Sequence, residues 1–163
     1  NRTLLNYYFR KKEKLFDLVF EMIFNQFVPG IINILTAEFS FLEKIDPFVD
    51  HYFDTLEKNP AIPLFILQEL STNPGNLVNK LKGEGVNPEA IVNQIKREME
   101  LGILKKEDPF QVFVNLISLV VFPFAGKPML QGLLFSGNAE EMNRFIKERR
   151  IYIKKYLKES LIN

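Results

Sequence analysis

The chain has 163 residues, of which 47% are hydrophobic and 25% charged, and its formal net charge is +1. This length and balance suit one globular domain with a well-packed core. Because the sequence contains no cysteine, disulfides and thiolate metal sites are excluded. No signal-peptide pattern opens the chain, so we expect a cytoplasmic protein.

Positive charge is concentrated at the start of the sequence. Residues 1–14 contain five basic side chains and one acidic side chain, whereas the remainder has 16 basic and 19 acidic residues. The local charge is therefore +4 and that of the remainder −3. This asymmetry predicts that a polyanion contacts the N-terminal tip rather than the whole surface.

Proline pairs mark most of the expected helix starts. An Asp or Asn followed by Pro places a side-chain oxygen at the N-cap and a fixed φ at the first helical position. Five such pairs begin at Asp46, Asn59, Asn73, Asn87 and Asp108. Each is a candidate helix start, although an Asn-Pro pair can equally open an isolated turn. Asn138, with Glu141 three residues later, predicts a sixth start.

No segment alternates with period two for long enough to form a strand, so the sequence predicts an all-α fold. The expected helices span residues 1–9, 12–28, 31–42, 46–58, 60–72, 75–82, 88–102, 109–123 and 139–162.

The opening stretch "NRTLLNYYFRKKEKLF" combines aromatic and basic residues. In a helix over residues 1–9, Leu4, Leu5 and Tyr8 share an apolar face. The opposite face carries Arg2, Thr3, Asn6 and Tyr7. Such groups can bond base edges and phosphate oxygens in a major groove, and Lys12 at the start of the next helix can grip a phosphate. The same pattern also fits tyrosines that pack in a core and lysines that face solvent.

The run "TLLNYYFRKKEKLF" resembles the end of the helix-turn-helix in the tetracycline-repressor (TetR) family of bacterial transcriptional regulators. In that family the recognition helix ends in an aromatic pair, and after a short break Lys-Glu and Leu open a long connecting helix. Tyr8-Phe9, Lys12-Glu13 and Leu15 match this pattern, whereas Asn6 stands where the family commonly has tyrosine.

The resemblance implies a TetR-like division of the chain. Residues 1–16 would be the C-terminal part of the DNA-binding domain, whose first two helices would precede Asn1, and residues 17–163 the helical regulatory, ligand-binding and dimerisation domain. The residues implied to contact operator DNA are Arg2, Thr3, Asn6, Tyr7, Tyr8 and Lys12. The implied function is that of a repressor, which binds operator DNA as a homodimer and is released by an apolar or amphipathic small molecule.

The segment 110–124 is apolar on nearly every side. It stops at Pro123, short of the about 20 residues that a membrane span needs, so we expect a helix buried on all sides and no membrane segment. By the resemblance, the middle helices would surround a ligand pocket. The candidate lining residues are Phe24, Phe53, Phe65, Phe113 and Phe122. Apolar rings at helical spacing are equally expected of an ordinary core.

An apolar stripe on the last expected helix predicts a packing surface. The stripe consists of Met142, Phe145, Ile146, Arg149, Ile153, Tyr156 and Leu157, with cations on the other face. Exposed on a monomer, it would be an aggregation liability, so we expect it to form a homodimer interface about a two-fold axis. The resemblance implies the same, because in TetR-like proteins the last two helices pair with their copies.

No motif indicates an enzyme. His51 lacks a convergent cysteine or carboxylate pattern, which favours a surface or capping histidine over a metal ligand or general base. No nucleophile elbow, phosphate-binding glycine loop or zinc-type spacing occurs. We therefore expect no catalytic residue, metal or cofactor. The alternative function is a helical lipid or acyl-chain binding module without a DNA role, whose basic tip touches an anionic membrane.

Overall fold

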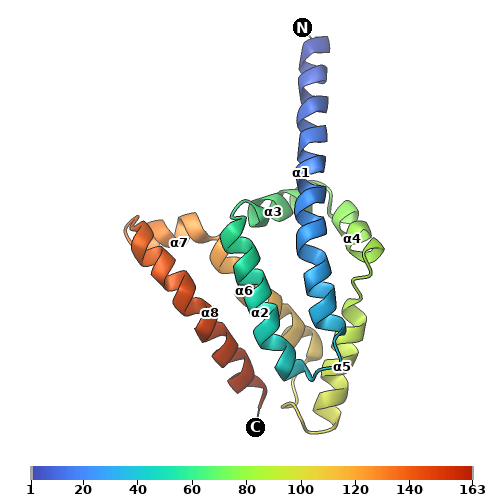
Figure 1. The fold of residues 1–163 in the computed structure, drawn as a ribbon, viewed down its shortest axis with the longest axis vertical. Helices are drawn as coiled ribbons and strands as arrows, with labels where there is room; N and C mark the ends of the chain where they lie inside the picture. Colours follow the sequence, from blue (N-terminus) through green and yellow to red (C-terminus); the bar gives the residue numbers. More distant parts are fainter. Residues whose placement is uncertain (1, 163) are drawn as a thin grey trace.

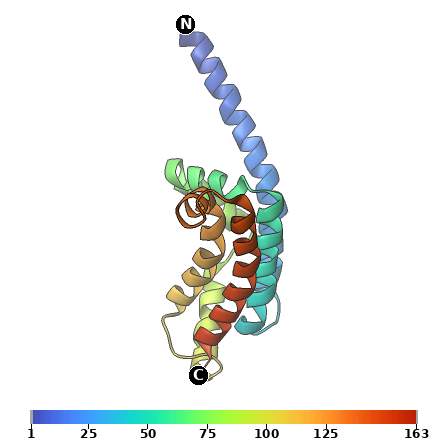
Figure 2. The ribbon, with the colours of Figure 1, turned by 90° about the vertical axis from the view of Figure 1, so that its left-hand side faces the viewer.

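The computed structural model describes the backbone of residues 2–162 and, from Lys14 onward, every side chain of that range except those of Leu15, Phe16, Val19, Phe20 and Ile23. This part of the chain is all-α, as the sequence predicts, with eight helices and no strand. The helices are α1 (Arg2–Thr36), α2 (Phe41–Lys58), α3 (Ile62–Thr72), α4 (Pro74–Gly83), α5 (Pro88–Glu100), α6 (Pro109–Ala125), α7 (Lys127–Leu134) and α8 (Ala139–Leu161). The long helix α1 extends well beyond the bundle formed by the others, and the C-terminus lies at the opposite end of the molecule (Figures 1 and 2).

The first helix is continuous where the sequence predicts three segments. α1 runs through the expected break at Arg10 and Lys11 and ends only at Thr36, so the boundaries of the predicted helices 1–9, 12–28 and 31–42 are wrong. Arg, Lys, Glu and Leu are good helix formers, and no Gly or Pro precedes Pro29 to end the helix. A separate recognition helix over residues 1–9 is therefore absent from this structure.

Pro29 lies inside α1 and does not end it. Proline removes one backbone hydrogen bond from a helix interior. Here Phe27, Val28 and Ile31 are all buried around it. Burial of three large apolar side chains contributes several kcal/mol, on the order of 1.5–3 kcal/mol for each side chain, which outweighs the local cost.

Gly30 allows α1 and α2 to approach closely. A Cβ atom at Gly30 would lie 2.2 Å from the His51 ring of α2, so the contact requires glycine. The His51 ring stacks on Phe27 with 5.7 Å between ring centroids, and its Nε2 lies 3.1 Å from the Phe27 carbonyl oxygen. His51 is therefore half-buried in a helix contact, and the prediction of a surface or capping histidine is wrong.

Side-chain caps open four helices where the sequence predicts them. Asn73, Asn87, Asp108 and Asn138 each accept a backbone N–H bond at the N-terminus of α4, α5, α6 and α8, respectively. Each such cap satisfies a backbone donor that the helix itself leaves free.

The other two predicted starts are wrong. Ser40 and Glu43 form a capping box that starts α2 at Phe41, so Pro47 of the Asp-Pro pair lies inside the helix. Asn59 is the C-cap of α2 rather than the N-cap of α3, and with Pro60 it opens a turn in which the Asn59 carbonyl oxygen accepts from the Ile62 N–H at 3.0 Å. The short helix α7 follows α6 after Gly126 and was not predicted.

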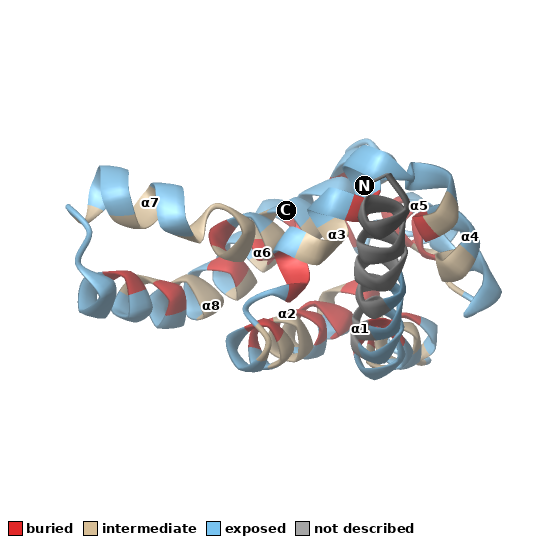
Figure 3. Ribbon diagram, turned by 90° about the horizontal axis from the view of Figure 1, so that it is seen from above, coloured by how far each residue is buried: buried red, intermediate tan, exposed pale blue. Residues whose placement is uncertain are grey.

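The core is built around α2, which packs against α1, α6 and α8. Its inward side chains Phe41, Ile45, Phe48, Val49 and Phe53 are 0–1% exposed. Seen from above, the buried positions of α2 and α8 lie mainly along the sides of these helices that face the interior of the bundle, toward α6 (Figure 3).

A row of ion pairs joins α2 to α8 along the edge of this core. Asp50 Oδ1 accepts from Arg150 Nε at 2.6 Å and from Lys154 Nζ at 2.5 Å, and Arg150 also reaches Asp54. Burial alone would raise the pKa of Asp50, but the hydrogen bonds and charges of Lys154 and Arg150 outweigh burial and hold that pKa below its usual value.

Candidate functional site

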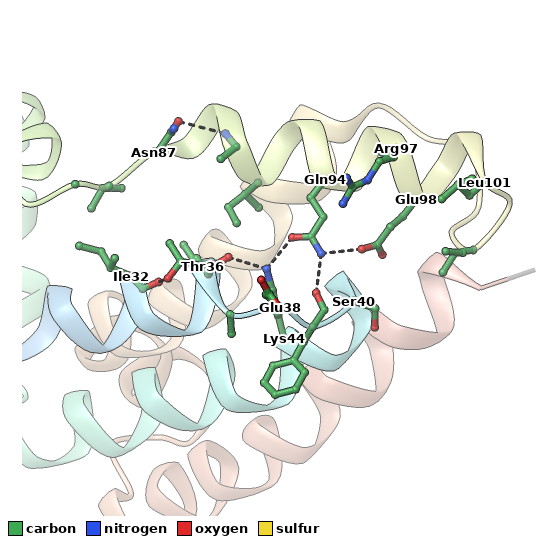
Figure 4. A pocket seen from close by; sticks show the side chains of 18 residues that line it. Ile32, Thr36, Glu38, Ser40, Lys44, Asn87, Gln94, Arg97, Glu98 and Leu101 are labelled. Atoms are coloured by element: carbon green, nitrogen blue, oxygen red, sulfur yellow. Dashed lines mark hydrogen bonds between the residues drawn. The ribbon is translucent and has the colours of Figure 1, made fainter.

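A cavity of about 830 Å³ lies at the end of the bundle where α1 stops, between the last turn of α1, the α1–α2 connection and α5 (Figure 4). Its apolar lining includes Ile32, Leu35, Val86, Ala90, Ile91, Leu101 and Ile103. Its polar lining includes Glu38, Lys44, Gln94, Arg97 and Glu98. A cavity of this size, mostly apolar with a few convergent polar groups, has the character of a small-molecule site.

Lys44 ties the end of α1 to α5. It is 3% exposed, and its Nζ donates to the Leu35 carbonyl oxygen and to Gln94 Oε1, both at 2.7 Å. Gln94 in turn donates through Nε2 to the Phe39 carbonyl oxygen and to Glu98 Oε1 (Figure 4). Burial lowers the pKa of Lys44, and the negative charge of Glu98 opposes that shift.

Glu98 fixes the start of α2. Its two carboxylate oxygens each accept from the Phe41 N–H at 3.1 Å, and it is 5% exposed. A carboxylate at a helix N-terminus is favoured by the free N–H groups and the helix dipole. The network Lys44–Gln94–Glu98 therefore joins the C-terminus of α1, the N-terminus of α2 and the middle of α5, and we call it the junction network.

The sequence analysis did not single out the junction network. A signal for it exists, because Lys44 falls on the face of α2 that carries Phe41 and Phe48, and Glu98 falls beside Ile95 on α5. A charge on an otherwise apolar helix face indicates a buried partner, but the sequence does not say which one.

The predicted pocket residues lie elsewhere. Phe24 and Phe53 are buried in the core, Phe65 and Phe113 are half-buried, and Phe122 is 53% exposed. None of them lines the cavity described above, nor a smaller one of about 540 Å³ between α2, α3, α7, α8 and the end of α6. The prediction that these five phenylalanines line a ligand pocket is therefore wrong for both cavities. Four of the five rings pack between helices instead.

The predicted dimer stripe of α8 is largely internal to the chain. Met142, Ile146, Ile153 and Leu157 are 0–4% exposed. They are covered by other helices of the same chain, so their assignment to an interface between two copies is wrong.

Three members of that stripe remain at the edge of the core. Phe145 packs on Phe135 with 5.5 Å between ring centroids, and the Arg149 guanidinium lies 5.5 Å from the Tyr152 ring centroid. Tyr156 is 49% exposed and stacks on Tyr152. These residues stay candidates for a contact with a partner.

The helix expected to be buried on all sides has one exposed apolar face. Phe110, Val114 and Phe122 of α6 are 65%, 56% and 53% exposed, whereas Val112, Leu116 and Val120 are buried. α6 contains no charged residue. The prediction of full burial is wrong because the described residues of this chain cover only one side of α6.

The candidate DNA-contact residues Arg2, Thr3, Asn6, Tyr7, Tyr8 and Lys12 lie outside the residues whose side chains the structure describes. Their backbone belongs to α1, at the end of that helix farthest from the cavity. The structure therefore brings the candidate DNA residues and the cavity onto one helix, at opposite ends.

Within the described part of the chain, no three His, Asp or Glu side chains are grouped so that they could hold a metal ion. In the same part, no single helix is long and apolar enough to cross a membrane; α6 and α7 together reach that length and composition but are bent by 69° at their junction. The chain matches no protein-family model, and a search of curated protein sequences finds no significant relative.

Proposed function

We propose that the chain belongs to a TetR-like, ligand-responsive transcriptional repressor that acts as a homodimer on operator DNA in the cytoplasm, with residues 1–16 as the end of its DNA-binding domain and residues 17–163 as its regulatory domain. The observation that carries the proposal is the continuity of α1, which has the basic segment at one end and lines the cavity at the other. At about 1.5 Å per residue, a helix of this length spans about 50 Å. A small displacement of its last turn would therefore be carried to the basic tip.

The proposed mechanism is a shift between two populations. A ligand in the cavity contacts the last turn of α1 and favours a different angle between α1 and the bundle. In a two-fold dimer, two such helices must present basic tips to half-sites about 34–36 Å apart on the duplex. The ligand lowers the affinity for DNA to the extent that it binds the mismatched conformation better.

The dimer contact that we propose is the outer face of α6, flanked by Tyr152 and Tyr156 of α8. α6 and α8 pack against each other, and Tyr156 of α8 lines a small hollow together with Gln111 and Asn115 of α6. An uncharged, exposed helix face suits a second copy of itself, because no like charges oppose each other across the axis.

DNA binding is tested by measuring the affinity of the full-length protein for duplex DNA by fluorescence anisotropy at a series of salt concentrations. Lys12→Ala is compared with Lys155→Ala, which removes an exposed lysine from α8. A lost phosphate contact should weaken binding to all sequences and reduce the slope of log K against log salt by about one. Lys155→Ala should leave both unchanged.

Equal affinity and equal salt slope for the wild type and Lys12→Ala would contradict the proposal. Weak binding with no salt dependence in any of the three proteins would contradict it as well, because a phosphate contact must release counterions.

A further inference from the structure

We propose that the cavity at the end of α1 binds an anionic amphiphile, a carboxylate on a hydrocarbon body, with the carboxylate held by Arg97 and Lys44. This inference deepens the proposed function by naming the chemical class of its effector. It rests on the proposed function only for the claim that the bound ligand regulates DNA binding. The binding itself depends on the cavity alone.

The apolar walls of the cavity indicate that its ligand has a hydrocarbon body. Ile32 and Leu35 of α1, Ile91 of α5, and Leu101 and Ile103 of the following loop contribute apolar side chains. Leu101 and Ile103 are 68% and 48% exposed, although both are large and apolar. An apolar chain that covered them would remove this surface from water, which favours binding.

The charge of the ligand follows from which polar groups of the cavity already have partners. Glu98 accepts from the Phe41 N–H and from Gln94, so its negative charge is held by the protein. Lys44 uses two of its three N–H groups, on Leu35 and Gln94, which leaves one for a further acceptor. A buried ammonium with a free N–H favours a negatively charged or carbonyl oxygen as its third partner.

Arg97 supplies the second positive charge. It is exposed, lies one helical position before Glu98, and takes part in no ion pair among the described residues. Arg97 is one of the residues of α5 that line the cavity, and Figure 4 labels it there with Gln94 and Glu98. A guanidinium can bind a carboxylate through two parallel N–H bonds.

A cationic ligand fits the cavity less well. The carboxylate of Glu38 also lines it, but Glu38 is exposed, and a cation placed there would lie in the same cavity as Arg97 and Lys44. A neutral ligand would leave the third N–H of Lys44 without a partner once water is displaced, which is costly for a buried charged group. One negative charge is therefore the best match.

The experiment is isothermal titration calorimetry on the full chain without DNA. The probes are decanoate, decanol and decyltrimethylammonium below their micelle concentrations. They share a hydrocarbon tail and differ in the charge of the head. Arg97→Gln removes the proposed counter-charge, and Arg144→Gln on α8 is its matched control, an exposed arginine outside the cavity. Ala90→Phe fills the cavity, and Asn93→Phe adds the same ring to α5 outside its lining.

Decanoate is expected to bind one site at least about tenfold more tightly than decanol or decyltrimethylammonium, the scale of one hydrogen bond to a charged group. Arg97→Gln should weaken decanoate by about tenfold and leave decanol unchanged, and Ala90→Phe should abolish binding of both. Both control variants should behave as the wild type does.

Equal affinity for the three probes, no saturable binding of decanoate, or unchanged decanoate affinity in Arg97→Gln would each overturn the inference. Decanoate binding by a protein that binds no DNA would support the proposed ligand site and contradict the proposed function as a transcriptional regulator. DNA binding without decanoate binding would do the reverse, so the two proposals fail separately.

Discussion

Helices α6 and α8 pack against each other in the bundle, yet they differ in how their apolar residues are buried. α8 turns Met142, Ile153 and Leu157 into the core and fastens its charged flank to α2 by the ion pairs of Arg150 and Lys154. α6 buries one side and leaves Phe110 and Val114 in solvent.

This difference indicates which helix face is available for contact with a second copy of the chain. α8 lies against α2 and α6 of its own chain, so most of its apolar stripe is buried within the monomer. The uncharged outer face of α6 has no such cover in the described part of the chain. Sequence amphipathicity identifies a face that must be buried, but it does not say whether the same chain or a second copy buries it.

The largest effect should come from the buried side of this comparison. Ile153→Ala removes a side chain that is 1% exposed, and the cavity it leaves should lower the free energy of unfolding by about 2–5 kcal/mol. Val114→Ala on α6 is the matched truncation of an exposed residue and should change it by no more than about 0.5 kcal/mol in the monomer. Urea unfolding followed by circular dichroism, at a concentration where both proteins are monomeric, measures the two values. Equal losses would mean that the outer face of α6 is as deeply packed as the inner face of α8.

The second effect concerns assembly. The double change Val114→Glu and Phe122→Glu places carboxylates on the proposed contact, where like charges would meet across a two-fold axis. We expect sedimentation velocity to show a dimer for the unmodified protein and a folded monomer for this variant.

The matched control for assembly is Ile151→Glu. Ile151 is 71% exposed, and helical periodicity places it on the side of α8 away from α6. This variant should remain a dimer. A monomer in the unmodified protein, or dissociation by Ile151→Glu alone, would contradict the assignment of the contact to α6.

A smaller effect should follow from the ion pairs that hold α8 to α2. Asp50→Asn should lower the free energy of unfolding at neutral pH by about 1 kcal/mol, because the pairs are partly exposed to solvent. The folded state lowers the pKa of Asp50 below 3.8, so the stabilisation is present above that pH and is lost as pH falls below it. The difference between wild type and variant should therefore shrink below about pH 4.

Denaturant unfolding at a series of pH values checks this, with Glu148→Gln as the control, an exposed carboxylate of α8 outside the ion-pair row. A difference between wild type and Asp50→Asn that stays constant with pH would show that the carboxylate contributes through shape rather than charge.

The smallest effect is expected on the outer side of α8. Lys155 and Glu159 lie 3.8 Å apart, with side chains 71% and 61% exposed. Lys155→Ala should change the free energy of unfolding by less than about 0.5 kcal/mol, because solvent and salt screen such pairs. If Lys155→Ala lowered the free energy of unfolding as much as Asp50→Asn does, the ion pairs on the outer side of α8 would be as stabilising as those that join it to α2, contrary to this prediction.

By itself the sequence determined the all-α class and the starts of four helices, at Asn73, Asn87, Asp108 and Asn138. These features are local, because a cap joins a side chain to a backbone N–H only two or three residues away. It also determined that α8 must bury an apolar stripe, since the spacing of apolar residues is a property of the helix alone.

Tertiary structure decided the rest. Because α1 packs on α2, it continues past Pro29 as a helix. The inner face of α8 packs within its own chain, whereas the outer face of α6 stays exposed. The junction network joins Lys44 to Gln94, which are 50 positions apart, and the cavity exists only because those positions meet at the end of α1. No local pattern encodes such a meeting, because it depends on which faces of separate helices bury the most apolar surface together.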